Sequence, residues 1–345
     1  MSRAIVRNAP YTRRREEPAV NEQRYRESER RLWRSLGVTP TEQLVRLPRI
    51  GVTVRVQELG QGPAVVFVHG GSNSGTSWAQ LAAQLSGFRC VMLDRPGCGL
   101  SDPLDARFDD VKALGTFAEA LIVDVLDAMQ INKAHLVATS FGGYMVLRTA
   151  AAHPERIGRM VQLGWTIGAP TAGFPLIMRI TGVPALAWLM TAVPPNERMV
   201  RMMFRSIGLR QALDAGRISQ ELIDAYVALL RDTDTMRNEI KTGPRIIKLW
   251  GMNNSVLLPK TLLTTIRTPV YFLWGQEDPF GGEDIAREFV KALPNCELEI
   301  MPGAGHAVWL DDPVQVANTI ARWLSDTTDA MRTEHREVFA EGTEV

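Results

Sequence analysis

The sequence predicts an α/β fold in which helices flank a mostly parallel central sheet and an α-helical segment is inserted as a cap. Three observations carry this prediction. Continuous apolar runs of five or six residues recur along the chain, with helical stretches between them. Polar residues follow several of these runs directly, where an open parallel sheet collects its reactive groups. About a hundred residues between Trp165 and Pro269 interrupt the alternation.

The N-terminal segment is strongly charged. Its first 35 residues hold ten arginines and five glutamates, whereas the whole chain of 345 residues has a net charge of only +1. We interpret residues 1–19 as a mobile arm and residues 21–37 as a short charged helix. Glutamates interleave with the arginines and no organised basic face results, which favours a solvated segment over a nucleic-acid-binding one. Residues 1–42 are therefore expected to lie outside the core. A small apolar patch would dock the helix: Leu32, Trp33 and Leu36.

The core is predicted over residues 43–165 and 263–325. It opens with a hairpin, because apolar and polar residues nearly alternate on both sides of Gly51. Continuous apolar runs then predict strands that are buried on both faces: 64–69, 90–94, 134–139, 160–165 and 270–275. Helices are expected at 77–86, 117–129, 141–152 and 313–324.

Residues 166–262 contain three helical stretches, punctuated by Pro184, Pro194 and Pro195. We interpret them as the helical cap, which would cover the strand ends and set substrate preference. Which cap residues bind substrate is left open. The last segment, 326–345, has six acidic residues, two arginines and almost nothing to bury, so it is predicted to be a disordered tail.

Composition excludes several function classes. The near-zero net charge gives no electrostatic argument for a nucleic-acid or anionic-membrane partner. Three irregularly spaced cysteines form neither a disulfide framework nor a metal-ligand pattern, so we expect free thiols and no metal. No apolar run is long enough to span a membrane, and the N-terminus lacks the apolar core of a signal peptide. We expect a cytoplasmic protein that takes a small-molecule substrate without a cofactor, and a homo-oligomer is compatible with the sequence.

One serine, one acid and one histidine follow different predicted strands, in the chain order Ser140, Asp278, His306. This order is typical of a nucleophile carried on a strand–turn–helix corner. A serine hydroxyl needs a base within hydrogen-bond reach, and a carboxylate on the far ring nitrogen fixes the tautomer of that base. Glu277 competes with Asp278 as the acid.

With these motifs the chain resembles the α/β-hydrolase fold family, in particular its serine hydrolases. The resemblance covers roughly residues 43–325. It rests on five segments in order: HGG at 69–71, DRPGCGLSD at 94–102, ATSFGG at 138–143, WGQED at 274–278 and GAGHAVW at 303–309.

The resemblance implies a role for each matching residue. Ser140 would be the nucleophile, Asp278 the orienting acid and His306 the general base. The oxyanion hole would consist of the backbone N–H groups of Gly71 and Phe141, with Ser72 as the substitute for Gly71. Four further residues are expected to shape the loops: His69, Asp94, Arg95 and Asp102.

The serine motif departs from the usual Gly-x-Ser-x-Gly, because its first position is Ala138. The corner forces its serine into a strained backbone conformation and crowds the flanking strand and helix, so the positions on either side must be small. Ala138 adds one methyl group and Gly142 keeps the tighter approach. We expect a slightly adjusted, working corner.

The favoured function is a carboxylesterase that acts on small or medium apolar esters through an acyl-enzyme. Carbon–carbon bond hydrolases of the family keep the same three residues, but this chain lacks their fuller HGGGPG segment and the tryptophan that often follows the histidine. Haloperoxidase-like activity shares the triad as well. A non-catalytic ligand-binding protein of the same fold is the alternative from another class. Ser140 argues against the family's dehalogenases and epoxide hydrolases, which use aspartate there.

Overall fold

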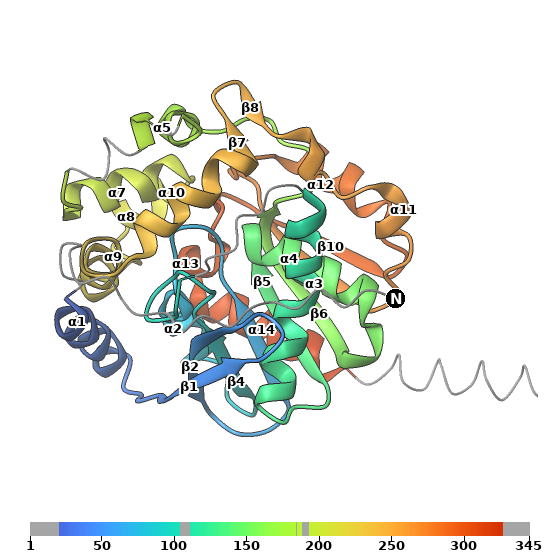
Figure 1. The fold of residues 1–345 in the computed structure, drawn as a ribbon, viewed down its shortest axis with the longest axis horizontal. Coiled ribbons are helices and arrows are strands. Elements are labelled where there is room, and N and C mark those ends of the chain that lie inside the picture. Colours follow the sequence, from blue (N-terminus) through green and yellow to red (C-terminus); the bar gives the residue numbers. More distant parts are fainter. Residues whose placement is uncertain (1–20, 104–110, 184, 188–192, 327–345) are drawn as a thin grey trace, which may run out of the picture.

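The computed structural model describes residues 21–103, 111–183, 185–187 and 193–326. In this part of the chain, helices cover both faces of an eight-stranded sheet (Figure 1). The predicted arm at 1–19 lies outside the described residues. The same holds for the predicted tail at 326–345, apart from Asp326.

The sheet has the strand order β1-β2-β4-β3-β5-β6-β9-β10. Strands β1 (Thr41–Leu47) and β2 (Val52–Leu59) form the predicted antiparallel hairpin at one edge, and β2 also runs antiparallel to β4. All other neighbours are parallel. The remaining strands are β3 (Ala64–Val68), β4 (Arg89–Leu93), β5 (Ala134–Thr139), β6 (Ile157–Thr166), β9 (Val270–Gly275) and β10 (Cys296–Met301). The mostly parallel sheet is therefore confirmed.

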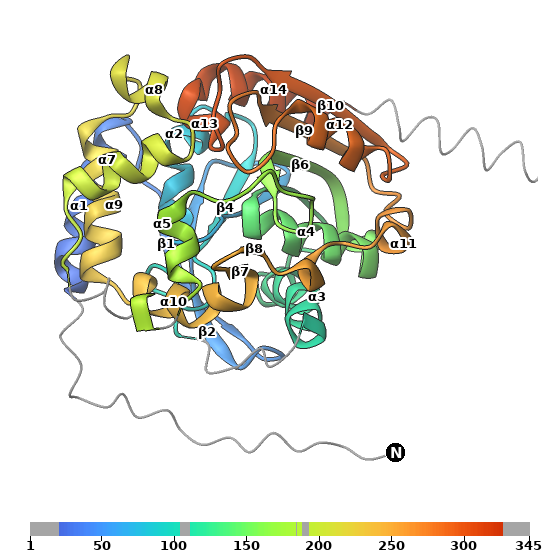
Figure 2. The same cartoon turned by 90° about the horizontal axis from the view of Figure 1, so that it is seen from above.

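The sheet separates two apolar clusters, which explains why its central strands, such as β3, β5 and β9, are almost continuously apolar. Along β3, Val66 and Val68 face one cluster, whereas Val65 and Phe67 face the other. The first cluster includes residues of α3 (Val111–Ala128), α4 (Ser140–Ala152), α11 (Lys260–Leu263) and α12 (Glu283–Val290). The second includes residues of α2 (Ala79–Ala82), α13 (Val308–Asp311) and α14 (Pro313–Ser325). Figure 2 shows these two groups of helices on opposite sides of the strands.

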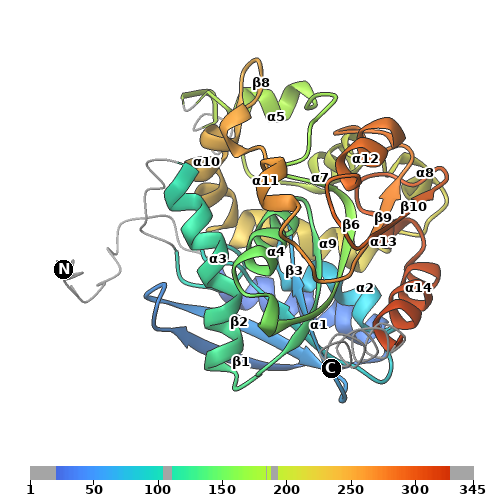
Figure 3. The same cartoon turned by 90° about the vertical axis from the view of Figure 1, so that its right-hand side faces the viewer.

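The segment between β6 and β9 is mainly helical, and Figure 3 shows α5 and α10 gathered at the side opposite the β1–β2 hairpin. Besides the short α11, its described helices include α5 (Leu176–Thr181), α7 (Glu197–Ser206), α8 (Arg210–Asp214), α9 (Gln220–Asp232) and α10 (Thr235–Ile246). A two-stranded hairpin of β7 (Ile247–Lys248) and β8 (Gly251–Met252) was not expected. Strands of two residues carry no periodic signal that a sequence pattern could reveal. No helix of the described residues combines the length and the apolar character needed to cross a membrane.

Helix α1 (Glu22–Ser35) connects the core to the inserted segment. Its Leu32 and Trp33 are buried in the cluster that also contains α2 and α14, as the predicted apolar patch requires. Its Tyr25 packs against Leu229 of α9, and α1 and α9 lie side by side (Figures 1 and 2). Glu29 of the same helix is only 2% exposed, so part of the charged face of α1 is buried together with the apolar patch.

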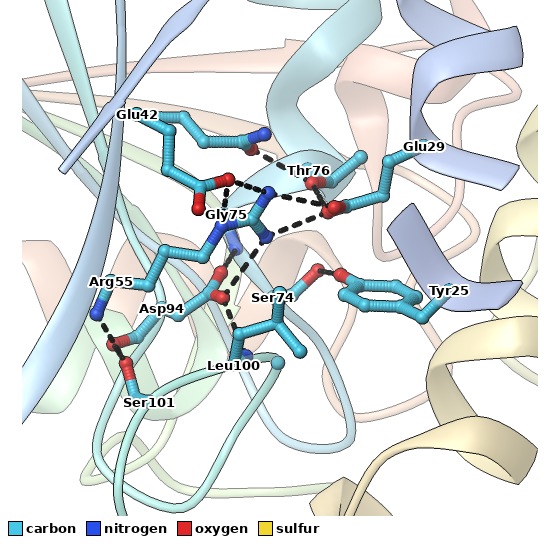
Figure 4. A network of polar contacts seen from close by, with 12 residues as sticks. Tyr25, Glu29, Glu42, Arg55, Ser74, Gly75, Thr76, Asp94, Leu100 and Ser101 are labelled. Atoms are coloured by element: carbon cyan, nitrogen blue, oxygen red, sulfur yellow. Dashed lines mark hydrogen bonds and ion pairs between the residues drawn. The ribbon is translucent and has the colours of Figure 1, made fainter. Parts of the chain in front are cut away.

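Glu29 belongs to a buried ion-pair network centred on Arg55 of β2 (Figure 4). The Arg55 guanidinium donates to both carboxylate oxygens of Glu29, at 2.9 and 2.7 Å, and to Asp94 at 3.3 Å. It also donates to Glu42 of β1 at 2.8 Å. The Thr76 hydroxyl, in the loop after β3, contacts Glu29 as well. The network therefore joins α1 to the edge of the sheet and to the loops that follow β3 and β4.

Candidate active site

Ser140 lies at the junction of β5 and α4, with a φ of +52°. This left-handed conformation is costly for a residue with a side chain, so the strained corner that the sequence predicts is present. A methyl group on Gly142 would collide with the carbonyl oxygen of Val68, which explains the glycine at that position. Ala138 is fully buried in the apolar cluster. The corner thus has room for one methyl group before the serine and for none after it.

Asp278 and His306 are in direct contact. His306 Nδ1 lies 2.8 Å from Asp278 Oδ2. The Trp165 N–H donates to the same oxygen at 2.8 Å, and the Phe280 N–H donates to Oδ1 at 3.0 Å. The Asp278 side chain is fully buried, whereas Glu277 is exposed. Three donors hold this carboxylate in one orientation. The geometry therefore selects Asp278 over Glu277 as the partner of His306.

Strand β6 ties Ser140 to this pair. The Ser140 carbonyl oxygen accepts from the Ile167 N–H and from the Thr166 hydroxyl, each at 3.1 Å. The preceding residue, Trp165, is the one that donates to Asp278. Serine and acid are thus anchored on consecutive residues at the end of one strand. Among the described residues no hydrogen bond links the Ser140 hydroxyl to the His306 ring, a contact that free enzymes often tighten only when substrate is bound.

The loop after β3 approaches the same corner. A methyl group on Gly70 would lie 2.9 Å from Ser140 Cβ and 3.4 Å from its Oγ. The next residue, Gly71, has no hydrogen-bond partner for its N–H in the described part of the chain. Phe141 is the second residue of α4, so helix geometry leaves its N–H without an intrahelical partner. Both N–H groups predicted for the oxyanion hole are therefore unpaired and belong to segments that flank Ser140.

His69 holds this loop in place, as predicted. It is fully buried, its Nε2 accepts from the Arg95 N–H at 3.0 Å, and its Nδ1 lies 2.8 Å from the Gly70 carbonyl oxygen. This pattern assigns the proton to Nδ1. Burial, together with the nearby Arg95 charge, lowers the pKa of His69 well below its ordinary value. His69 is therefore a neutral, fixed ring that shapes the loop.

An aromatic cluster surrounds His306. The Phe280 ring packs edge-on against the imidazole with 4.6 Å between centroids, and Trp165 lies beside both rings. Phe174, from the segment after β6, contacts Trp165 and Phe280. These rings exclude water from one side of the histidine and form an apolar wall. Sequence reasoning did not find this wall, because its members come from three separate segments.

Arg95 and Glu239 were also missed as site residues. The sequence predicts Arg95 as a loop-shaping residue, and its guanidinium does bind the Gly70 carbonyl oxygen at 2.7 Å. It also lies over the Phe141 ring, 4.9 Å from the centroid, and pairs with Glu239 of α10 at 3.0 Å. Cys98 donates to the same carboxylate, and burial raises the pKa of its thiol well above the usual range. That thiol is consequently a poor nucleophile.

Other polar groups have structural partners. His135 Nδ1 accepts from the Arg159 N–H at 3.1 Å, and the backbone N–H of His153 ends α4 by donating to Thr149. In the described ranges, no three His, Cys, Asp or Glu side chains come together in a way that could hold a metal ion.

Comparison with known proteins extends these observations. Residues 65–319 match the model of the alpha/beta hydrolase family. A 2-hydroxy-6-oxononadienedioate/2-hydroxy-6-oxononatrienedioate hydrolase of Burkholderia vietnamiensis is 28% identical over 284 residues, 78% of this chain and 91% of that protein. A 2-hydroxy-6-oxo-6-phenylhexa-2,4-dienoate hydrolase of Burkholderia cepacia is 26% identical over 79% of this chain and 93% of that protein.

The solved structures agree in fold. A carboxylesterase from Bacillus subtilis superposes with a TM-score of 0.66 at 18% identity, over 88% of this chain and 98% of that chain. A 2-hydroxy-6-oxo-6-phenylhexa-2,4-dienoate hydrolase from Rhodococcus gives a TM-score of 0.64 at 19% identity, over 82% and 99%. The matched family model, the sheet order and the strained serine corner point the same way: the chain belongs to the alpha/beta hydrolase family and is a hydrolase of that fold.

Proposed function

We propose that the protein is a serine hydrolase in which Ser140 is the nucleophile, His306 the general base and Asp278 the orienting acid. One observation carries the proposal: the strained serine and the Asp278–His306 pair are anchored on consecutive residues of β6. A serine held in a costly left-handed conformation, on the strand that also anchors a buried carboxylate–imidazole pair, supports a functional role.

In the proposed mechanism the Ser140 hydroxyl attacks a substrate carbonyl carbon while His306 Nε2 takes its proton. Asp278 holds the other ring nitrogen and stabilises the imidazolium that forms. The N–H groups of Gly71 and Phe141 would bind the developing oxyanion, each contributing about 3–4 kcal/mol to lowering the barrier. His306 then returns the proton to the leaving alcohol. Water, activated by the same base, releases the acid and restores the serine.

The proposed substrates are small or medium esters with an apolar acyl group. The aromatic wall beside His306 supports this class, because it offers contact area without a polar partner. The inserted segment at 166–262 is proposed to cover the strand ends and to select among acyl chains. Carbon–carbon bond hydrolysis is the second candidate, and the similarity to the two Burkholderia hydrolases named above favours it.

A fluorophosphonate probe tests the proposal directly. We expect covalent labelling of the wild-type protein at Ser140, found by peptide mass spectrometry, and none in Ser140→Ala. A parallel panel of nitrophenyl esters and ring-fission-type diketones, varied in acyl length, separates the two candidates. Absence of both labelling and turnover in folded wild-type protein would leave the non-catalytic ligand-binding alternative.

A further inference from the structure

Glu239 lies beside the proposed oxyanion donor Gly71. A methyl group on Gly71 Cα would be 3.2 Å from Glu239 Oε2. The other carboxylate oxygen, Oε1, accepts from Arg95 at 3.0 Å and from the Cys98 thiol at 3.3 Å. Among the described residues no hydrogen bond or ion pair reaches Oε2. One oxygen is therefore held by the loop after β4, and the other faces the loop that would bind the reacting carbonyl.

Of the two charges in this ion pair, a bound molecule would meet the carboxylate. The Arg95 side chain is only 4% exposed, whereas that of Glu239 is 23% exposed. Arg95 is covered because its guanidinium binds the Gly70 carbonyl oxygen and stacks on Phe141. The Arg95 guanidinium is thus buried against the loop, and the Glu239 carboxylate is the accessible charge of the pair.

The backbone around Glu239 is fixed, so the carboxylate cannot move away with α10 at low cost. The Gly99 N–H donates to the Thr235 hydroxyl at 2.9 Å, in the first turn of α10. The Asn238 amide donates to the Gly97 carbonyl oxygen, also at 2.9 Å. These contacts hold two further residues of the helix, Thr235 and Asn238, against the loop that also binds Glu239, which is the rigid support that a selective site needs.

We propose that Glu239 is a specificity-determining residue that restricts the enzyme to substrates without a carboxylate near the reacting carbonyl. The inference rests on the proposed function, because it takes Ser140 and Gly71 as the position of that carbonyl. A like charge placed against Glu239 in a partly desolvated site is repelled, and this repulsion rejects anionic substrates. Without the Glu239 charge, the Arg95 guanidinium lacks its counter-ion and attracts a carboxylate instead.

A matched pair of esters measures this selectivity: the mono-p-nitrophenyl ester of adipic acid, whose chain is too long for rapid anhydride closure by its own carboxylate, and the same ester with its free carboxyl methylated. For the wild-type protein we expect kcat/KM to favour the methylated ester by about tenfold or more. Glu239→Gln should raise the ratio of anionic to neutral kcat/KM by at least about tenfold. The control is Glu197→Gln, which removes an exposed carboxylate of α7 that pairs with Arg201. It should leave the ratio within about twofold of wild type. Equal ratios in wild type and Glu239→Gln would overturn the inference.

Binding without turnover separates this inference from the proposed mechanism. In the Ser140→Ala background, calorimetry should show tighter binding of the methylated ester than of the anionic one, and Glu239→Gln should remove or reverse that preference. Charge-selective binding in a protein that fails to label with fluorophosphonate would contradict the mechanism and keep the inference. Normal labelling with indifferent binding of the two esters would contradict the inference alone. If Glu239→Gln fails to fold, the inference is still open to refutation, because equal binding of the two esters by the wild-type protein would contradict it.

Discussion

Two clusters of buried charge in the described part of the chain are built differently. Around Arg55, a permanent cation is surrounded by Glu29, Glu42 and Asp94. At the other cluster, the Asp278 carboxylate meets two backbone N–H groups and the His306 ring. The first contains a cation that cannot lose its proton at ordinary pH, whereas the second contains a base that can gain one.

This difference indicates which cluster can do chemistry. The Arg55 guanidinium is surrounded by carboxylates and keeps its proton at ordinary pH. Its role is therefore to hold together the segments that it joins. Backbone donors hold Asp278 without supplying a competing positive side chain, which is the arrangement that the proposed role of His306 as general base requires. Substitutions in the two clusters should therefore change different quantities: the catalytic rate at Asp278 and the free energy of unfolding at Arg55.

Asp278→Asn should lower kcat/KM for the best ester by about 10⁴-fold, because an amide stabilises the wrong tautomer of His306 and no imidazolium. The free energy of unfolding should change far less than the barrier. The measurement is steady-state kinetics together with urea unfolding. Glu277→Gln is the control and should be close to wild type. Near-normal rates in Asp278→Asn would reject Asp278 as the orienting acid.

Arg55→Met should lower the free energy of unfolding by about 3–5 kcal/mol, because it leaves Glu29 and Asp94 buried without their counter-ion. Urea midpoints at an unchanged m-value measure this loss. Arg26→Met is the matched control: it also removes a partner of Glu42, but one that is about a third exposed, and should cost less than about 1 kcal/mol. If both variants lost the same free energy of unfolding, the buried Arg55 ion pairs would be no more important for stability than the partly exposed Arg26 pair.

Asp311→Asn should change how stability depends on pH. Burial raises the pKa of Asp311 to about 6, although its Oδ2 accepts from the Gly305 N–H at 2.8 Å. Its Oδ1 is buried without a hydrogen-bond partner. The pKa of Asp311 is higher in the folded protein than in the unfolded chain. Its contribution to the free energy of unfolding is therefore fully present below about pH 4 and is lost as pH rises through 6.

Asparagine keeps an acceptor for Gly305 and cannot ionise. Between pH 4 and pH 7, the free energy of unfolding of the wild-type protein should therefore fall by up to about 3 kcal/mol relative to that of Asp311→Asn. Thermal unfolding of both proteins across this range measures the difference. Parallel stability curves would show that the Asp311 carboxyl titrates as it does in the unfolded chain.

Ala138→Gly should have the smallest effect and leave kcat/KM within a few fold of wild type. The strand already accommodates the methyl group, and its removal costs about 0.5–1 kcal/mol of stability through backbone freedom. Gly142→Ala provides the contrast, because its new methyl group would meet the Val68 carbonyl oxygen and should abolish activity. Esterase assays on the two variants measure the asymmetry of the serine corner. Similar rates in both would contradict it.

Local patterns predicted the sheet and the strand-end residues well. The apolar run at 134–139 is β5 itself, and Asp278 follows β9 as expected, because both depend on short segments whose neighbours in sequence are also neighbours in space. The proposed catalytic roles of Ser140 and His306 remain predictions until labelled or mutated. Their surroundings, however, agree with the strained corner and the buried pair that the sequence suggests.

Long-range contacts between charged residues could not be predicted. Glu29 and Arg55 are 26 residues apart, and Arg55 and Asp94 are 39 apart. A glutamate among arginines on a helix has the pattern of a solvated surface. Glu239 gave no signal either, because its partner Arg95 lies 144 residues away. Such pairs become visible only when the fold brings them together.

The position of α1 has a practical consequence for any shortened version of this protein. Deleting residues 1–42 would remove what a sequence-based domain boundary treats as an appendage. It would also uncover the apolar surface under Leu32 and Trp33 and leave Arg55 without its Glu29 and Glu42 partners. Exposed apolar patches of this kind promote aggregation. If such a shortened protein precipitated during expression, the cause would be the loss of α1 and not an unstable hydrolase core.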